Sequence, residues 1–143
     1  MKTASEAVSE QATRSMLAKN ATGVIILDLR KLSSLTDFFV IGTASSEPQI
    51  KAIVEQITGD LKEKEIVPWH TEGKQNWRWV LLDYVDVVIH VFRNETRSFY
   101  DLERLWGDAP KITVSVDDQT GEIIHSQDME VTSDYLKTVE HEV

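Results

Sequence analysis

The chain has 143 residues, 41% of them hydrophobic, and its 15 Lys and Arg against 24 Asp and Glu give a formal charge of −9. This length suits one domain with a single core, and the lack of cysteine excludes a disulfide framework, a thiolate metal site and a cysteine nucleophile. The acidic balance argues against a general nucleic-acid binder, because such binding depends on Lys and Arg at the phosphates.

The first half of the chain is predicted to form two helices and two strands. Apolar side chains at every fourth position predict an amphipathic helix over the first twenty residues. Residues 24–29 and 37–42 are rich in β-branched side chains and almost continuously apolar, which is typical of strands covered on both faces. Ser46 and Gln49 have the spacing of a capping box, and the apolar stripe through residues 50–61 predicts the helix that follows.

The next segment is predicted to form three strands. They cover residues 67–71, 78–83 and 86–92, and the connection between the last two is so short that it predicts an antiparallel hairpin. Together with the helices, these strands indicate an α/β (α+β) fold. We expect a mixed sheet of about five strands with helices packed on it.

A short helix is predicted next, over residues 98–106, capped by Ser98 together with Asp101. Its buried face is expected to consist of Phe99, Leu102 and either Leu105 or Trp106.

The chain is predicted to divide at residue 109, where Gly107 ends the last helix and Pro110 follows. Residues 1–109 then form the domain, and residues 110–143 form an acidic C-terminal extension. Alternating apolar residues on either side of a turn-rich segment predict a second hairpin in this extension. For residues 133–143, a weak acidic helix and a disordered tail remain equal alternatives.

Few residues are arranged for chemistry. No two histidines have metal-ligand spacing, and His90 is interpreted as a partly buried side chain satisfied by a neighbouring carboxylate. Asp83 and Asp86 flank a tight turn, where they would either hold a divalent cation or serve as ordinary turn residues. The loop of residues 42–46 enters a helix and is able to receive an anion, but no Asp-x-Asp pair follows it to hold metal ions.

Aromatic and arginine side chains crowd into residues 77–106. These residue types dominate the energetics of protein interfaces, and they also fill cores. The core and interface interpretations are compatible, since the two sets of side chains can lie on opposite faces of the sheet.

This stretch resembles the signature of the Iojap-like ribosomal silencing factors. The resemblance rests on residues 79–92 (WVLLDYVDVVIHVF) and 97–106 (RSFYDLERLW), with upstream matches at residues 36–41 (TDFFVI) and 44–46 (ASS). It covers about residues 5–109. It departs at Val85, where the family commonly has glycine, and in the residues that follow Pro110.

The resemblance implies a nucleotidyltransferase-like fold that lacks the catalytic motif, and a protein that is not an enzyme and needs no cofactor or metal. Family members bind the large ribosomal subunit through its fourteenth ribosomal protein, block association with the small subunit and repress translation when nutrients are limited. An acidic domain suits a basic ribosomal protein better than bare RNA, so we expect no direct nucleic-acid recognition. The family precedent supports a homodimer of the free factor, which the sequence leaves open.

Carried over by motif position, the expected partner-binding residues are Trp79, Asp83, Asp86, His90, Arg97 and Tyr100. Trp79 and Tyr100 are expected to be apolar anchors, while Asp83 and Asp86 face basic side chains. His90 and Arg97 either join the contact or lock the hairpin to the last helix.

No apolar run approaches the roughly 20 residues of a membrane span, and the N-terminus lacks a targeting pattern, so the expected location is the cytoplasm. The alternative function is a metal-dependent nucleotidyltransferase-like enzyme that uses Asp83 and Asp86.

Overall fold

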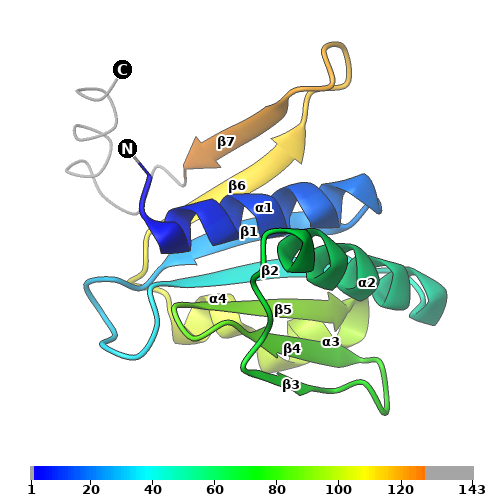
Figure 1. The fold of residues 1–143 in the computed structure, drawn as a ribbon, viewed down its shortest axis with the longest axis horizontal. Helices are drawn as coiled ribbons and strands as arrows, with labels where there is room; N and C mark the ends of the chain where they lie inside the picture. The colour runs from blue at the N-terminus through cyan, green and yellow to red at the C-terminus, as the bar shows by residue number, and fades with distance from the viewer. Residues whose placement is uncertain (1, 128–143) are drawn as a thin grey trace.

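The computed structural model describes residues 2–127 (Figure 1). Its helices are α1 (Ala4–Ala18), α2 (Glu47–Glu63), α3 (Asn94–Tyr100) and α4 (Leu102–Leu105). Its strands are β1 (Thr22–Asp28), β2 (Phe38–Ala44), β3 (His70–Glu72), β4 (Trp79–Asp83), β5 (Val87–Arg93), β6 (Lys111–Val116) and β7 (Ile123–Gln127). No helix among these residues is long and apolar enough to span a membrane.

The strands form one mixed sheet in the order β3-β4-β5-β2-β1-β6-β7. Neighbouring strands β2 and β5 run parallel, and each of the other neighbouring pairs is antiparallel. The mixed α+β architecture is therefore confirmed. The expected count of about five strands is wrong: the sheet has seven, because the hairpin beyond residue 110 pairs with β1.

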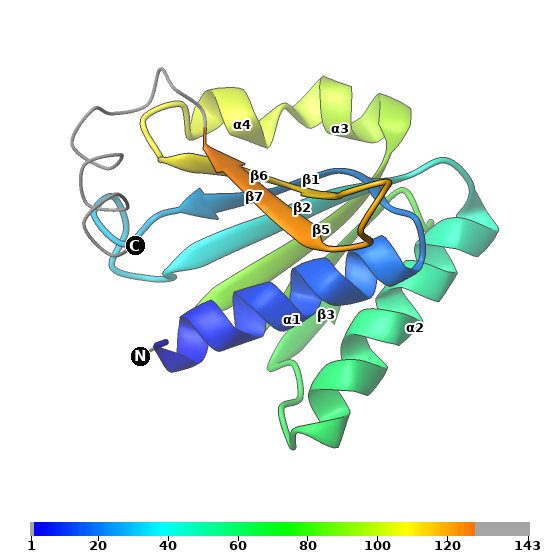
Figure 2. The same cartoon turned by 90° about the horizontal axis from the view of Figure 1, so that it is seen from above.

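Helices cover both faces of the sheet, but unequally (Figure 2). The long helices α1 and α2 lie on one face over the larger apolar cluster, which includes Met16 and Leu82. The short helices α3 and α4 lie on the other face over a smaller cluster that includes Ile41 and Phe92. Since neither α3 nor α4 has a fully buried residue, this second face is only thinly covered.

Helix α2 begins as its sequence predicts. The Ser46 side chain accepts a hydrogen bond from the Gln49 N–H at 3.2 Å, and the Gln49 side chain accepts one from the Ser45 N–H at 2.7 Å. The predicted apolar stripe is buried against the sheet. The amide groups that an anion would need at this helix start are thus partly occupied by the helix's own side chains.

The hairpin of β4 and β5 is confirmed, and its turn is strained. The Asp86 N–H donates to the Tyr84 carbonyl at 3.0 Å, and Val85 between them has a φ of +71°. This φ is that of a rare form of γ-turn, which a β-branched residue adopts only with strain.

The predicted last helix is broken into two. Helix α3 already begins at Asn94, so Ser98 lies inside it and does not cap it. Asp101 then adopts the left-handed conformation with a φ of +46° and separates α3 from α4. The predicted cap by Ser98 and Asp101 is therefore wrong.

The break also changes which side chains are buried. Leu102 and Trp106 pack on the smaller cluster, as expected. Phe99 is 81% exposed, so the expectation that it contributes to the buried face is wrong, and of the alternatives Leu105 and Trp106 it is Leu105 that is exposed, at 74%. A left-handed residue rotates the chain, and side chains before and after it no longer share one helical face.

The predicted second hairpin is confirmed as β6 and β7. Strand β6 pairs with β1, and Val114 is buried in the larger cluster beside α1. The predicted division at residue 109 falls between α4 and β6, and the hairpin after it belongs to the same sheet. The alternatives for residues 133–143 lie outside the described residues.

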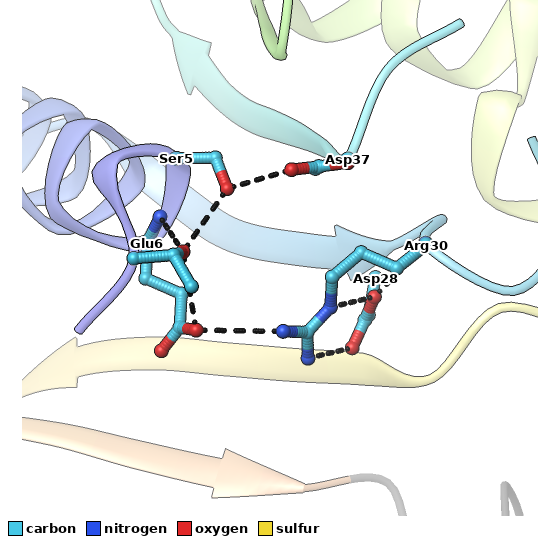
Figure 3. Close-up of polar contacts among 6 residues, drawn as sticks. Ser5, Glu6, Asp28, Arg30 and Asp37 are labelled. Atoms are coloured by element: carbon cyan, nitrogen blue, oxygen red, sulfur yellow. Dashed lines mark hydrogen bonds and ion pairs between the residues drawn. The ribbon is translucent and has the colours of Figure 1, made fainter. Parts of the chain in front are cut away.

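A polar network fixes the first turn of α1 against the sheet (Figure 3). The Ser5 hydroxyl donates to the Asp37 carboxylate at 2.8 Å. Arg30 binds both oxygens of Asp28 at 2.7 and 2.9 Å and approaches Glu6 at 3.4 Å. The acidic side chains at this end of β1 and β2 therefore have partners within the fold, which indicates a structural role for them.

Candidate interaction surface

Trp79 lies on the thinly covered face of the sheet because side chains alternate along β4. Val80 and Leu82 are buried in the larger cluster, so Trp79 points to the opposite side, under α3. Its ring stacks on Phe92, the cross-strand partner on β5, with the centroids 4.8 Å apart. One side of the Trp79 ring is therefore packed within the fold, and it is not available to a partner.

His90 lies beside Trp79 on the same face and is only 3% exposed. The Trp79 indole Nε1–H donates to His90 Nδ1 at 3.0 Å. Burial lowers the pKa of His90 to about 3, which keeps the imidazole neutral. The predicted burial of His90 is confirmed. The predicted carboxylate partner is wrong, because the hydrogen bond to Nδ1 comes from the Trp79 indole on the neighbouring strand.

Tyr100 carries the aromatic contacts from the sheet to the surface. Its ring lies 4.7 Å from that of Trp79 and 5.1 Å from that of Phe99. Tyr100 is 51% exposed, and with Phe99 and Leu105 it forms what we call the α3–α4 surface. Two hollows of about 500 and 540 Å³ flank the Phe99 and Tyr100 side chains. Large apolar side chains that project between hollows are typical of protein-binding surfaces.

Arg97 holds α3 to the sheet. Its guanidinium donates to the Gly23 carbonyl at 2.6 Å, to the Thr43 hydroxyl at 2.7 Å and to the Glu103 carboxylate at 2.9 Å. One side chain thus joins α3 to β1, β2 and α4. With its side chain only 15% exposed, Arg97 serves mainly as a clamp within the fold.

Asp83 and Asp86 lie apart from the other predicted site residues. They flank the hairpin turn, and Asp83 is about 13 Å along β4 from Trp79. The Asp83 carboxylate accepts the Val85 N–H at 2.8 Å, while Asp86 is exposed. No group of three or more His, Cys, Asp or Glu side chains within residues 2–127 is placed to hold a metal ion.

Three of the six predicted residues therefore come together, namely Trp79, His90 and Tyr100, while Arg97 attaches α3 to β1 and β2. The exposure of Phe99 and Leu105 was not predictable from the local sequence pattern. The left-handed residue Asp101 lies between them, and nothing in the local sequence marks that position as a break.

The comparisons with known proteins agree with the motifs. The family described as "Ribosomal silencing factor during starvation" matches residues 2–138. The chain belongs to this family. Among its relatives, the ribosomal silencing factor RsfS of Halalkalibacterium halodurans is 42% identical over 94 residues, which are 66% of this chain and 80% of that protein.

Two further comparisons concern a mouse relative of this ribosomal silencing factor and a solved structure with a similar fold. The mouse protein named "Mitochondrial assembly of ribosomal large subunit protein 1" is 32% identical over 108 residues, which are 73% of this chain and 45% of that protein. An X-ray crystal structure of a Chromobacterium violaceum protein superimposes with a TM-score of 0.70 at 34% identity, over 75% of this chain and 88% of that chain. The resemblance inferred from the sequence is therefore confirmed, and the fold agrees with an experimental structure.

Proposed function

We propose that this ribosomal silencing factor binds the large ribosomal subunit in the cytoplasm through the fourteenth ribosomal protein, and that its α3–α4 surface makes the contact. Membership of the silencing-factor family supports the association with ribosomes. The name of the mouse relative connects that protein with the large subunit. The observation that carries the proposal is the exposure of Phe99, Tyr100 and Leu105 on a thinly covered sheet face.

The chemistry of this surface suits a protein partner. Its centre is aromatic and aliphatic, which favours burial against another protein. The net charge of −9 disfavours bare RNA and favours a basic protein surface. A bound protein of this size at the face that meets the small subunit would prevent joining by steric exclusion, so the proposed action involves no catalysis and no direct recognition of nucleic acid.

The test is co-sedimentation of the chain with separated ribosomal subunits, followed by addition of small subunits. Phe99→Ala is expected to weaken binding to large subunits by about tenfold, since exposed aromatic anchors commonly contribute more than 1 kcal/mol. Leu35→Ala is the matched control, because Leu35 is equally exposed, at 84%, and lies in the loop between β1 and β2. Equal binding by both variants would show that the α3–α4 surface is not the contact with the large subunit. If the unaltered chain did not bind large subunits, the proposed function itself would be wrong.

A second variant tests the predicted role of the hairpin turn. Asp86→Arg reverses an exposed charge far from α3, so a loss of binding would show that the contact extends along β4 to the turn. Unchanged binding of the folded variant would remove Asp83 and Asp86 from the contact surface. Sedimentation of the free chain in the same gradients would distinguish a monomer from a homodimer.

A further inference from the structure

His90 occupies the centre of a group of aromatic rings under the α3–α4 surface. Its ring meets Phe39 edge to face at 4.6 Å and lies 5.9 Å from Trp79 and 6.1 Å from Phe92. It is the only buried side chain among these rings that offers a hydrogen-bond acceptor within the described residues. A polar group at this depth is costly unless it is paired, so its partner matters.

The hydrogen bond to Trp79 defines the state of His90. An indole N–H only donates, so Nδ1 of His90 has to be an unprotonated acceptor. The neutral imidazole then carries its proton on Nε2, which has no hydrogen-bond partner among residues 2–127. Because burial holds the pKa near 3, this acceptor persists at every physiological pH.

The fixed indole in turn supports the exposed rings. Tyr100 packs on Trp79 at 4.7 Å, and Phe99 packs on Tyr100 at 5.1 Å. Helix α3 has no fully buried residue of its own, so the Trp79 ring is a main support beneath it. A hydrogen bond in the sheet thus connects, through two ring contacts, to the side chain that stands out into solvent.

We propose that His90 is a positioning residue for the α3–α4 surface: its Nδ1 orients the Trp79 indole, and Trp79 holds Tyr100 and Phe99 in the conformation that the partner binds. This inference rests on the proposed function, because it assigns His90 a part in that binding without direct contact. A preformed surface binds more tightly than one that adopts the binding conformation only part of the time.

The decisive comparison is His90→Leu against His90→Asn. Leu and Asn have nearly the same shape and both lack the ring, but only Asn keeps an acceptor close to the position of Nδ1. We expect His90→Leu to weaken large-subunit binding by about tenfold, as when the binding conformation is populated about a tenth of the time. His90→Asn is expected to stay within about threefold of the unaltered chain. Equal losses in the two variants would overturn the proposal.

A double-mutant cycle with Trp79→Phe isolates the hydrogen bond, because Phe keeps a ring and removes the N–H. In the Trp79→Phe background, His90→Leu is expected to change binding by less than about twofold, since the donor is already absent. A further tenfold loss in that background would show that His90 acts by some route other than the indole, and would overturn the proposal.

Indole N–H signals in a nitrogen–proton NMR spectrum give a readout that needs no ribosome. The chain has four tryptophans, and the signal that Trp79→Phe removes belongs to Trp79. We expect its protection from exchange, and the contacts between the Trp79 and Tyr100 rings, to be lost in His90→Leu and kept in His90→Asn. If the unaltered chain binds no large subunits, the proposed function fails while these signals still test the positioning. Loss of the ring contacts with binding unchanged would overturn the role of His90 in binding.

Discussion

Val85 is a β-branched residue in a backbone conformation that favours glycine. Its φ of +71° costs about 1–2 kcal/mol for a residue with a side chain. Val85→Gly is therefore expected to raise the free energy of unfolding by about 1 kcal/mol, after the greater freedom of glycine in the unfolded chain is subtracted. Urea unfolding measures the change. Val116→Gly is the control, because Val116 is similarly exposed but lies within the regular strand β6. This variant is expected to lower the free energy of unfolding by about 1 kcal/mol.

If Val85→Gly were destabilising like its control, the turn would not be strained. The sequence alone marks Val85 as a departure from the glycine common in the family. The reason why glycine suits this position is given by the φ value and by the hydrogen bond between Asp86 and Tyr84.

The buried neutral state of His90 makes stability depend on pH. The folded-state pKa is about 3 and the unfolded value is about 6.5, so the unfolded chain binds more protons between these limits. His90 therefore stabilises the fold least at low pH: its contribution is complete above pH 6.5 and falls as the pH is lowered. Between pH 6.5 and pH 5 the expected loss is about 2 kcal/mol.

His90→Asn removes this titration and leaves the carboxylates in place. Denaturant unfolding at pH 7 and pH 5 is expected to show a smaller pH dependence for His90→Asn than for the unaltered chain, by about 2 kcal/mol. Identical pH dependence in the two proteins would mean that the fold does not lower the pKa of His90.

Among the elements, α3 and α4 are joined to the sheet by the Arg97 clamp as well as by their apolar contacts. Arg97→Lys keeps the charge but loses the guanidinium geometry that reaches Gly23, Thr43 and Glu103 together. Each hydrogen bond to a charged group contributes about 1.5–3 kcal/mol, so we expect amide exchange in residues 94–106 to accelerate by about tenfold or more. Exchange in α1 and α2 is expected to change little.

Hydrogen exchange followed by mass spectrometry measures this effect. The matched control is Arg104→Lys, an arginine of α4 that lines one of the surface hollows. Faster exchange throughout the molecule would show that Arg97 stabilises the whole fold, and unchanged exchange would show that it is no clamp.

Element boundaries were predictable where a local signal sets them. The Ser46 cap and the short β4–β5 turn are encoded within a few residues, and both appear where predicted. The clamp by Arg97 depends on contacts with β1 and β2, more than fifty residues away in the sequence, and no local signal marks the break at Asp101. A reading of local patterns therefore predicted one continuous helix and did not predict its exposed face.

For the whole molecule, the hairpin of β6 and β7 is expected to unfold with the rest of the sheet. Val114 is 3% exposed in the larger cluster, so Val114→Ala should lower the free energy of unfolding by about 2 kcal/mol. The control is the neighbouring Ser115→Ala, at an exposed position. Tryptophan fluorescence during urea unfolding reports the transition, since all four tryptophans lie outside the hairpin. An unchanged transition in Val114→Ala would mean that the hairpin is independent of the main body.

At this scale the sequence predicted the strands better than their order. The mixed sheet and the hairpins follow from apolar patterns, but the pairing of Ile25 with Thr113 joins segments that share no local signal. Gly107 and Pro110 predict a C-terminal extension separate from the domain, although the buried Val114 shows that β6 contributes to the core.

The position of β1 between β2 and β6 has a consequence for the chain during its own synthesis. The backbone groups on one edge of β1 can pair as soon as β2 has been synthesised. Those on the other edge stay unpaired until residues Lys111 to Thr113 have been added. At about 5–20 residues per second, roughly 3–14 seconds separate the completion of β2 from that of β6. During this interval the nascent protein exposes one unpaired edge of an apolar strand. Such edges are bound by chaperones and also promote aggregation.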